Sequence, residues 1–215
     1  MIVDLTLYII YLALLAGIIG FTFYNKLPDY KAKSILFLIF YSFLTEFVGV
    51  HFKSWTGIVN FPVFNLYILV IFIYYIILLK LLLIKIKNQR IASVFLLLFI
   101  LFYILNLLFI QTSFLEPYSN SYCVGVILLL VLSCLYLLEI FNSGKILNFK
   151  KSIFFWFVLG ILVFHVPFLP FMLAIRLFLV ENFELSYTII SFSLNLLMYS
   201  CFVIGFIWSE KRYNY

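Results

Sequence analysis

The chain has 215 residues, of which 67% are hydrophobic and only 10% are charged, and its mean hydropathy is +1.24. A soluble domain carries about 25% charged residues because water must wet its surface, so this composition excludes a water-soluble domain of this size. The net charge of +6 does not indicate direct nucleic-acid binding, since the basic residues lie between apolar runs and form no patch with aromatic residues. The sequence therefore predicts a protein whose main surroundings are the lipid bilayer.

Apolar runs of membrane-spanning length recur along the chain. A bilayer core of about 30 Å takes roughly 20 residues of helix. Backbone groups in lipid must be bonded within the segment, and the runs lack the alternation of a barrel strand, so helices are favoured. The predicted fold is an all-α, polytopic transmembrane helix bundle that forms a single domain over residues 1–215. Its seven expected spans are Leu5–Tyr24, Ser34–His51, Pro62–Leu83, Ile91–Gln111, Ser121–Phe141, Ser152–Leu173 and Leu185–Trp208.

The basic residues fall in alternate connections. The segments after the first and fifth runs, the end of the third run with the segment after it, and the C-terminal tail hold 12 of the 14 Lys and Arg residues, and the exceptions are Lys53 and Arg176. Cytoplasmic loops of membrane proteins are enriched in Lys and Arg. This rule predicts the N-terminus outside, the C-terminus in the cytoplasm and a multi-pass protein of a bacterial inner membrane. The alternation also requires an odd number of crossings, which supports seven.

The first run carries a stripe of small residues, Ala13, Ala16, Gly17 and Gly20. Small residues let helix backbones approach closely in lipid. The stripe is expected either to pack against another helix of the same chain or to form the contact of a homo-oligomer.

Six polar residues inside the runs are the candidate ligand-binding residues. Counting 1.5 Å per residue from the ends of the runs places all six in the outer half of the membrane. They are Glu46, His51, Asn65, Asn106, His165 and Asn195.

Two hypotheses account for these residues. Burying an ionisable group in lipid costs several kcal/mol, so the first is an outward-facing cavity with Glu46 as its charged centre and His165 as its partner. A kink at Pro167 and Pro170 would open it. The second is that the polar groups hydrogen-bond between helices and hold the bundle together. Glu139 lies near the cytoplasmic end of its run and is expected to extend toward Lys145.

The patterns of known enzyme and metal sites are missing from the sequence. It has no HExxH, no GxSxG and no glycine-rich phosphate loop, and the last run has no lysine that could hold retinal. The three cysteines have no CxxC spacing, and the two histidines lack the clustered ligands that a metal needs. We therefore expect no catalytic residues, no metal and no cofactor.

Four segments carry a resemblance to a known family: Asp29–Lys33, "FYSFLTEFVG" at 40–49, "NFPVFNLY" at 60–67 and "LNLLMYSCFVIGFIWSEK" at 194–211. They resemble a family of small seven-helix integral membrane proteins of Bacteroidota. In that family a Glu in the second helix and Asn-x-Tyr at the start of the third recur, which match Glu46 and Asn65–Tyr67 here. A further acidic residue of the family's third helix is missing from this chain. The resemblance implies a seven-helix membrane fold and no particular activity.

The leading functional hypothesis is a non-enzymatic membrane protein that senses or binds a ligand in an outer-half polar pocket. Its connections are too short to form an output domain, so a cytoplasmic or membrane protein partner would receive the signal. A small transporter or pore is an alternative, because Asn65 and Asn195 would fall in equivalent helices of a three-plus-one-plus-three carrier. An accessory or effector membrane protein of a bacterial defence (CRISPR-associated) system is a third.

Overall fold

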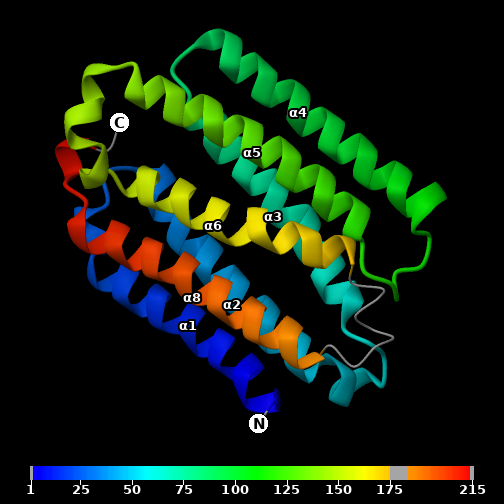
Figure 1. Ribbon diagram of the computed structural model, residues 1–215. Helices are drawn as coiled ribbons and strands as arrows, with labels where there is room; N and C mark the ends of the chain where they lie inside the picture. The colour runs from blue at the N-terminus through cyan, green and yellow to red at the C-terminus, as the bar shows by residue number, and fades with distance from the viewer. Residues whose placement is uncertain (1, 175–183, 214–215) are drawn as a thin grey trace.

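The computed structural model describes residues 2–174 and 184–213, and these residues form helices and connections without any β-strand. The helices run alternately up and down as one bundle (Figure 1). The α-helices are α1 (Ile2–Thr22), α2 (Tyr30–Thr56), α3 (Phe61–Leu82), α4 (Ile86–Leu105), α5 (Ser119–Phe141), α6 (Ile153–Leu173) and α8 (Glu184–Trp208). The shorter elements are η1 (Tyr24–Lys26), the π-helical continuation of α4 called η2 (Asn106–Ile110), η3 (Gly144–Lys151) and η4 (Lys211–Tyr213).

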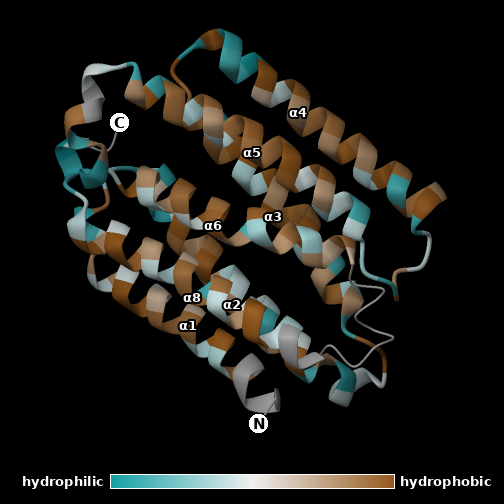
Figure 2. Ribbon diagram, viewed as in Figure 1, coloured by the Kyte–Doolittle hydropathy of each residue, from teal (hydrophilic) through white to brown (hydrophobic). Residues whose placement is uncertain are grey.

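Six of these helices are long and apolar enough to cross a membrane, and α1 adds a shorter apolar segment at Leu7–Thr22. Figure 2 shows the helices largely hydrophobic along their length, with hydrophilic residues concentrated toward the two ends of the bundle and in the connections. Each expected span coincides with one of the helices of the described residues. The prediction of an all-α bundle is therefore confirmed for the described residues, which form seven α-helices, six of them long and apolar enough to cross a membrane.

The boundaries of α2 follow from its capping residues. The side chain of Asp29 accepts a hydrogen bond of 3.0 Å from the Ala32 N–H, which satisfies one of the unpaired donors of the first turn. Gly57 ends the helix in the left-handed conformation with φ of 74°, where a residue with a Cβ would be strained. The helix therefore extends beyond the expected run at both ends.

Antiparallel helices α2 and α3 are joined by hydroxyl pairs at successive levels. Ser34 Oγ lies 2.8 Å from Tyr74 Oη, and Ser42 Oγ lies 2.9 Å from Tyr67 Oη. Interhelical hydrogen bonds of this kind hold membrane helices together in lipid. They fix the register of α2, and with it the level at which Glu46 lies.

The small-residue stripe of α1 is buried inside the chain. All four residues, from Ala13 to Gly20, are buried where α1 packs against α2 and α8. A Cβ added to Gly20 would lie 2.7 Å from the ring of Phe206 on α8, which is closer than real Cβ contacts. The packing explanation therefore accounts for the stripe, and its residues are not accessible to a second copy.

The basic connections meet at one end of the bundle. Lys31 Nζ donates to the Leu81 carbonyl over 3.2 Å, and Lys151 Nζ lies 2.7 Å from Glu210 Oε1. This ion pair and the neighbouring Arg212 lower the pKa of the exposed Glu210 carboxyl below its usual value. We call this the basic end. Arg176, one of the two exceptions to the predicted pattern, lies outside the described residues.

Glu139 on α5 caps the N-terminus of α4. Its oxygens accept hydrogen bonds from the Ile84 N–H, the Lys85 N–H and Asn88 Nδ2. The residue at the N-cap position of α4 is Lys85, whose side chain has no acceptor, so a carboxylate from the neighbouring helix takes that role. Glu139 thus bonds the α3–α4 connection. The side chain of Lys145, toward which it was expected to extend, lies outside the described part of the structure.

Candidate functional site

A partly enclosed cavity of about 140 Å³ lies between α2, α3, α5, α6 and α8, in the half of the bundle away from the basic end. One carboxylate, two amides, an imidazole, a serine and three tyrosines provide its polar lining, and half of the remaining lining residues are phenylalanines. The polar residues are Glu46, Asn65, Tyr67, Tyr122, His165, Tyr187, Ser191 and Asn195. The apolar residues are Phe61, Phe64, Ile68, Ile71, Pro117, Phe164, Phe168 and Met172.

Four of the six candidate residues share this cavity. Glu46, Asn65, His165 and Asn195 come from α2, α3, α6 and α8. The sequence predicted that these residues lie at similar depths in the membrane. The structure adds that they line the same cavity inside the bundle.

Glu46 is the only carboxylate among the described residues of the lining. It is partly accessible, and no hydrogen bond or ion pair joins it to any residue in the described part of the chain. Tyr67 and Tyr187 line the same cavity. The carboxylate therefore shares the cavity with aromatic side chains, and no bond within the described residues occupies its oxygens.

His165 is held by tyrosines and not by Glu46. The side chain is 3% exposed, and its Nδ1 lies 2.9 Å from Tyr122 Oη. Its Nε2 lies 3.3 Å from Tyr75 Oη. The expected partners thus line one cavity without contacting each other. The two prolines that were expected to open α6, Pro167 and Pro170, lie inside one continuous α-helix. His165 lines the cavity from within this helix.

Asn65 builds the cavity wall. Its Nδ2 donates to the Phe114 carbonyl over 3.2 Å and to the Glu116 carbonyl over 2.9 Å. Its Oδ1 accepts from the Tyr118 N–H over 3.0 Å. These bonds fasten the α4–α5 connection to α3 and position Pro117 in the lining. The amide of Asn65 has no unused donor left for a ligand.

Asn195 keeps an acceptor for the cavity. Its Nδ2 donates to the Ser191 carbonyl one turn earlier on α8, over 2.9 Å. This bond orients the amide and leaves its carbonyl oxygen as an acceptor beside the cavity.

The remaining two candidates, Asn106 and His51, lie outside the cavity. Asn106 is fully buried and donates its Nδ2 to Gln111 Oε1 over 3.1 Å, which orders the start of the α4–α5 connection. His51 Nδ1 bonds the Phe47 carbonyl of its own helix over 2.9 Å, and its ring stacks on Trp55. Neither residue lines the cavity, so the prediction that they share one pocket with Glu46 is wrong.

The sequence prediction omitted the tyrosines of the cavity, Tyr67, Tyr122 and Tyr187. Each lies within two turns of the start of its helix. Tyrosine at that depth is common because its amphipathic ring favours the membrane interface. Their position in the sequence therefore gave no sign that they face the interior.

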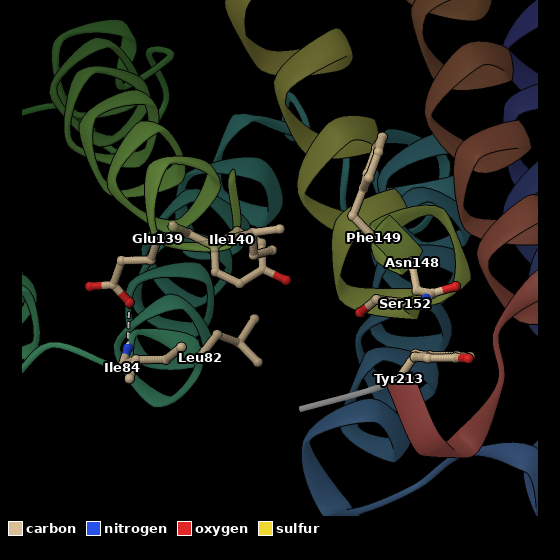
Figure 3. A pocket seen from close by; sticks show the side chains of 9 residues that line it. Leu82, Ile84, Glu139, Ile140, Asn148, Phe149, Ser152 and Tyr213 are labelled. Atoms are coloured by element: carbon tan, nitrogen blue, oxygen red, sulfur yellow. Dashed lines mark hydrogen bonds between the residues drawn. The ribbon is translucent and has the colours of Figure 1, made fainter. Parts of the chain in front are cut away.

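A second hollow lies at the basic end, between α5, η3 and η4 (Figure 3). Figure 3 shows Glu139 bonded to Ile84 on one side, and Phe149, Ser152 and Tyr213 on the other. Its volume is about 20 Å³. A water molecule needs roughly 10–15 Å³ of such space, so this hollow holds one or two waters and no organic ligand.

The site was also tested for metal ligands and for similarity to known proteins. Among the described residues no group of three or more His, Cys, Asp or Glu side chains could hold a metal ion. Comparisons with protein-family models, with curated proteins and with solved structures gave no match. Fold and site together define the class as a multi-pass helical membrane protein with an internal polar-aromatic cavity.

Proposed function

We propose that the chain is a non-enzymatic membrane protein that binds a small molecule in the cavity around Glu46. The observation that carries this proposal is the Glu46 carboxylate, which lies among aromatic rings and is not hydrogen-bonded or ion-paired within the described residues. A charge at membrane depth is costly, and such residues mark binding sites or ion paths unless another group compensates them. A bound ligand would supply that compensation.

The proposed orientation places the N-terminus outside and the C-terminus in the cytoplasm of a bacterial inner membrane. Its support is the gathering of the basic connections at one end of the bundle, since Lys and Arg are enriched in cytoplasmic loops. In this orientation the cavity lies in the outer half of the membrane and takes its ligand from the outer side.

A sensor role follows from the helices that line the cavity. Five helices contribute to the lining, and each continues to the basic end. A ligand that changes the spacing of these helices would change the arrangement of the cytoplasmic connections. Because those connections are short, a cytoplasmic or membrane protein partner would receive the signal.

The test of ligand binding uses the purified protein in lipid nanodiscs and a panel of small polar and aromatic compounds. We expect at least one compound to raise the unfolding temperature in a saturable way. Glu46→Ala should abolish this rise while the yield of folded protein stays the same. The matched control is Leu44→Ala, which alters a lipid-exposed residue of the same helix and should keep the rise.

Two results would contradict binding. One is a panel with no stabilising compound. The other is a Glu46→Ala variant whose only change is less folded protein in the membrane, which would assign Glu46 to packing. Accumulation of the ligand inside sealed proteoliposomes would show that the cavity serves transport, the alternative use of such a site.

A further inference from the structure

We infer that the cavity selects a small organic cation, an amine joined to a compact apolar or aromatic body, with Glu46 as its counter-ion. This inference rests on the proposed ligand-binding function and adds the chemical class of the ligand.

The charges of the lining favour a cation. Among the described residues, Glu46 is the only carboxylate in the lining, and none of the lining residues is a lysine or arginine. The one basic side chain, His165, has both ring nitrogens bonded to tyrosine hydroxyls. Within the described part of the wall, an anion would meet no lysine or arginine and would face the Glu46 carboxylate. An ammonium group would form a charge-assisted hydrogen bond with Glu46, which is about twice as strong as a neutral one.

The unused hydrogen-bonding groups favour a ligand that donates. The amide of Asn65 is bonded on both sides to the α4–α5 connection. Asn195 has given one of its two N–H groups to the Ser191 carbonyl, so one N–H and the carbonyl oxygen remain. With the two oxygens of Glu46, the cavity therefore presents mainly acceptors, and an ammonium group has three donors and no acceptor.

The aromatic walls and the size of the cavity complete the match. Phenylalanine rings from α3 and α6, among them Phe64 and Phe164, line the space beside the carboxylate. Aromatic faces attract cations by about 0.5–2 kcal/mol, and more where water is excluded. The volume of about 140 Å³ is close to the roughly 150 Å³ of an apolar cavity that admits benzene. The cavity therefore suits an amine on a body of about one ring.

Three ligands of nearly equal shape test the charge preference: 4-fluorobenzylamine, 4-fluorobenzyl alcohol and 4-fluorobenzoate. Binding to the intact chain in zwitterionic nanodiscs is followed by ¹⁹F NMR line broadening, with empty nanodiscs as the control for partition into lipid. We expect saturable binding of the amine, the weakest binding of the benzoate, and an intermediate affinity of the alcohol.

The variant Glu46→Gln keeps the shape of the side chain and removes its charge. We expect this variant to lower the affinity for the amine about 10- to 100-fold, which is the range for loss of a hydrogen bond to a charged group. The affinity for the alcohol should stay nearly unchanged. Leu44→Ala should leave both affinities as in the unmodified chain.

The inference is overturned if the alcohol or the benzoate binds as tightly as the amine, or if Glu46→Gln leaves amine binding unchanged. In either case the cavity still binds a ligand, and the proposed function stands. Failure of all three ligands to bind the folded chain also overturns the inference. The proposed function then falls only if the broader panel gives no stabilising compound either.

Discussion

The hydroxyl of Tyr122 on α5 lies 2.9 Å from Nδ1 of His165 on α6, inside the wall of the cavity. The Tyr75 hydroxyl on α3 lies 3.3 Å from the other ring nitrogen. One imidazole therefore joins three helices in the wall of the cavity that Glu46 also lines. Polar contacts between membrane helices are typically worth about 0.6 kcal/mol and reach about 1.7 kcal/mol, so this link contributes measurably to the stability of the bundle.

The first prediction concerns this link. We expect Tyr122→Phe and His165→Phe each to lower the free energy of unfolding, and the double variant to lose less than the sum of the two. A coupling energy above about 0.5 kcal/mol would exceed the usual limit for independent sites. Reversible unfolding in mixed micelles measures it. Strictly additive losses would show that the Tyr122–His165 bond does not form.

The comparison is a second double-mutant cycle, in which the unfolding free energies of Glu46→Gln, His165→Phe and their double variant are measured in the same way. Because the structure has neither a hydrogen bond nor an ion pair between these two residues, their effects should add within about 0.3–0.5 kcal/mol. A coupling as large as that of Tyr122 with His165 would mean that the carboxylate and the imidazole interact directly.

The second prediction concerns the contact of α6 with α8. A Cβ added to Gly160 would lie 2.7 Å from the ring of Phe202 and 3.1 Å from the Met198 carbonyl oxygen. Gly160→Ala should therefore force the helices apart and lower the unfolding free energy by about 1–3 kcal/mol. The control is Gly144→Ala, where no atom lies within 4 Å of the added Cβ. It should stay within about 0.5 kcal/mol of the unmodified chain. Equal effects of the two variants would contradict the close approach.

The helices could be predicted from the sequence because each apolar run is long enough to span a bilayer, and lipid leaves the backbone few alternatives to a helix. Their ends were less certain, since they depend on single residues. Asp29 and Gly57 extend α2 beyond its apolar part, and neither belongs to the hydropathy signal.

The sequence predicted how deep in the membrane the site residues lie, but not toward which neighbouring helices their side chains point. Position along a run gives depth, and this placed Glu46 and His165 at a similar level. Direction around the helix axis depends on which helices are neighbours, and hydropathy does not encode that order. Asn106 has the right depth and yet bonds Gln111 beside the cavity. The choice of Tyr122 as the partner of His165 likewise follows from the order of the helices.

The third prediction concerns topology. In a variant whose three cysteines are replaced by alanine, we introduce single cysteines at Thr112 and at Asn142, which are exposed at opposite ends of the bundle. With the N-terminus outside, a membrane-impermeant maleimide should label Thr112→Cys in intact spheroplasts. It should label Asn142→Cys only after the membrane is permeabilised. The opposite pattern would reverse the proposed orientation, and labelling of both in intact spheroplasts would contradict the bundle as a membrane-spanning unit.

The last prediction concerns Glu139, which is 7% exposed and accepts hydrogen bonds from the Ile84 and Lys85 N–H groups and from Asn88. Glu139→Ala leaves these donors without an acceptor at the N-terminus of α4. An unsatisfied buried donor costs about 1–3 kcal/mol, so we expect a loss of stability in that range. Glu139→Gln retains one acceptor oxygen and should lose less.

Hydrogen exchange distinguishes this cap from a general packing role of Glu139. The Ile84 and Lys85 amides should exchange much faster in Glu139→Ala, while amides in the middle of α5 keep their protection. The control is Asn142→Ala at the end of the same helix, whose side chain bonds only the Leu138 carbonyl of its own helix and is exposed. That variant should leave the Ile84 and Lys85 amides protected. Unchanged exchange at both amides in Glu139→Ala would show that the first turn of α4 is held by other contacts, such as the bond from Gln89 Nε2 to the Leu83 carbonyl.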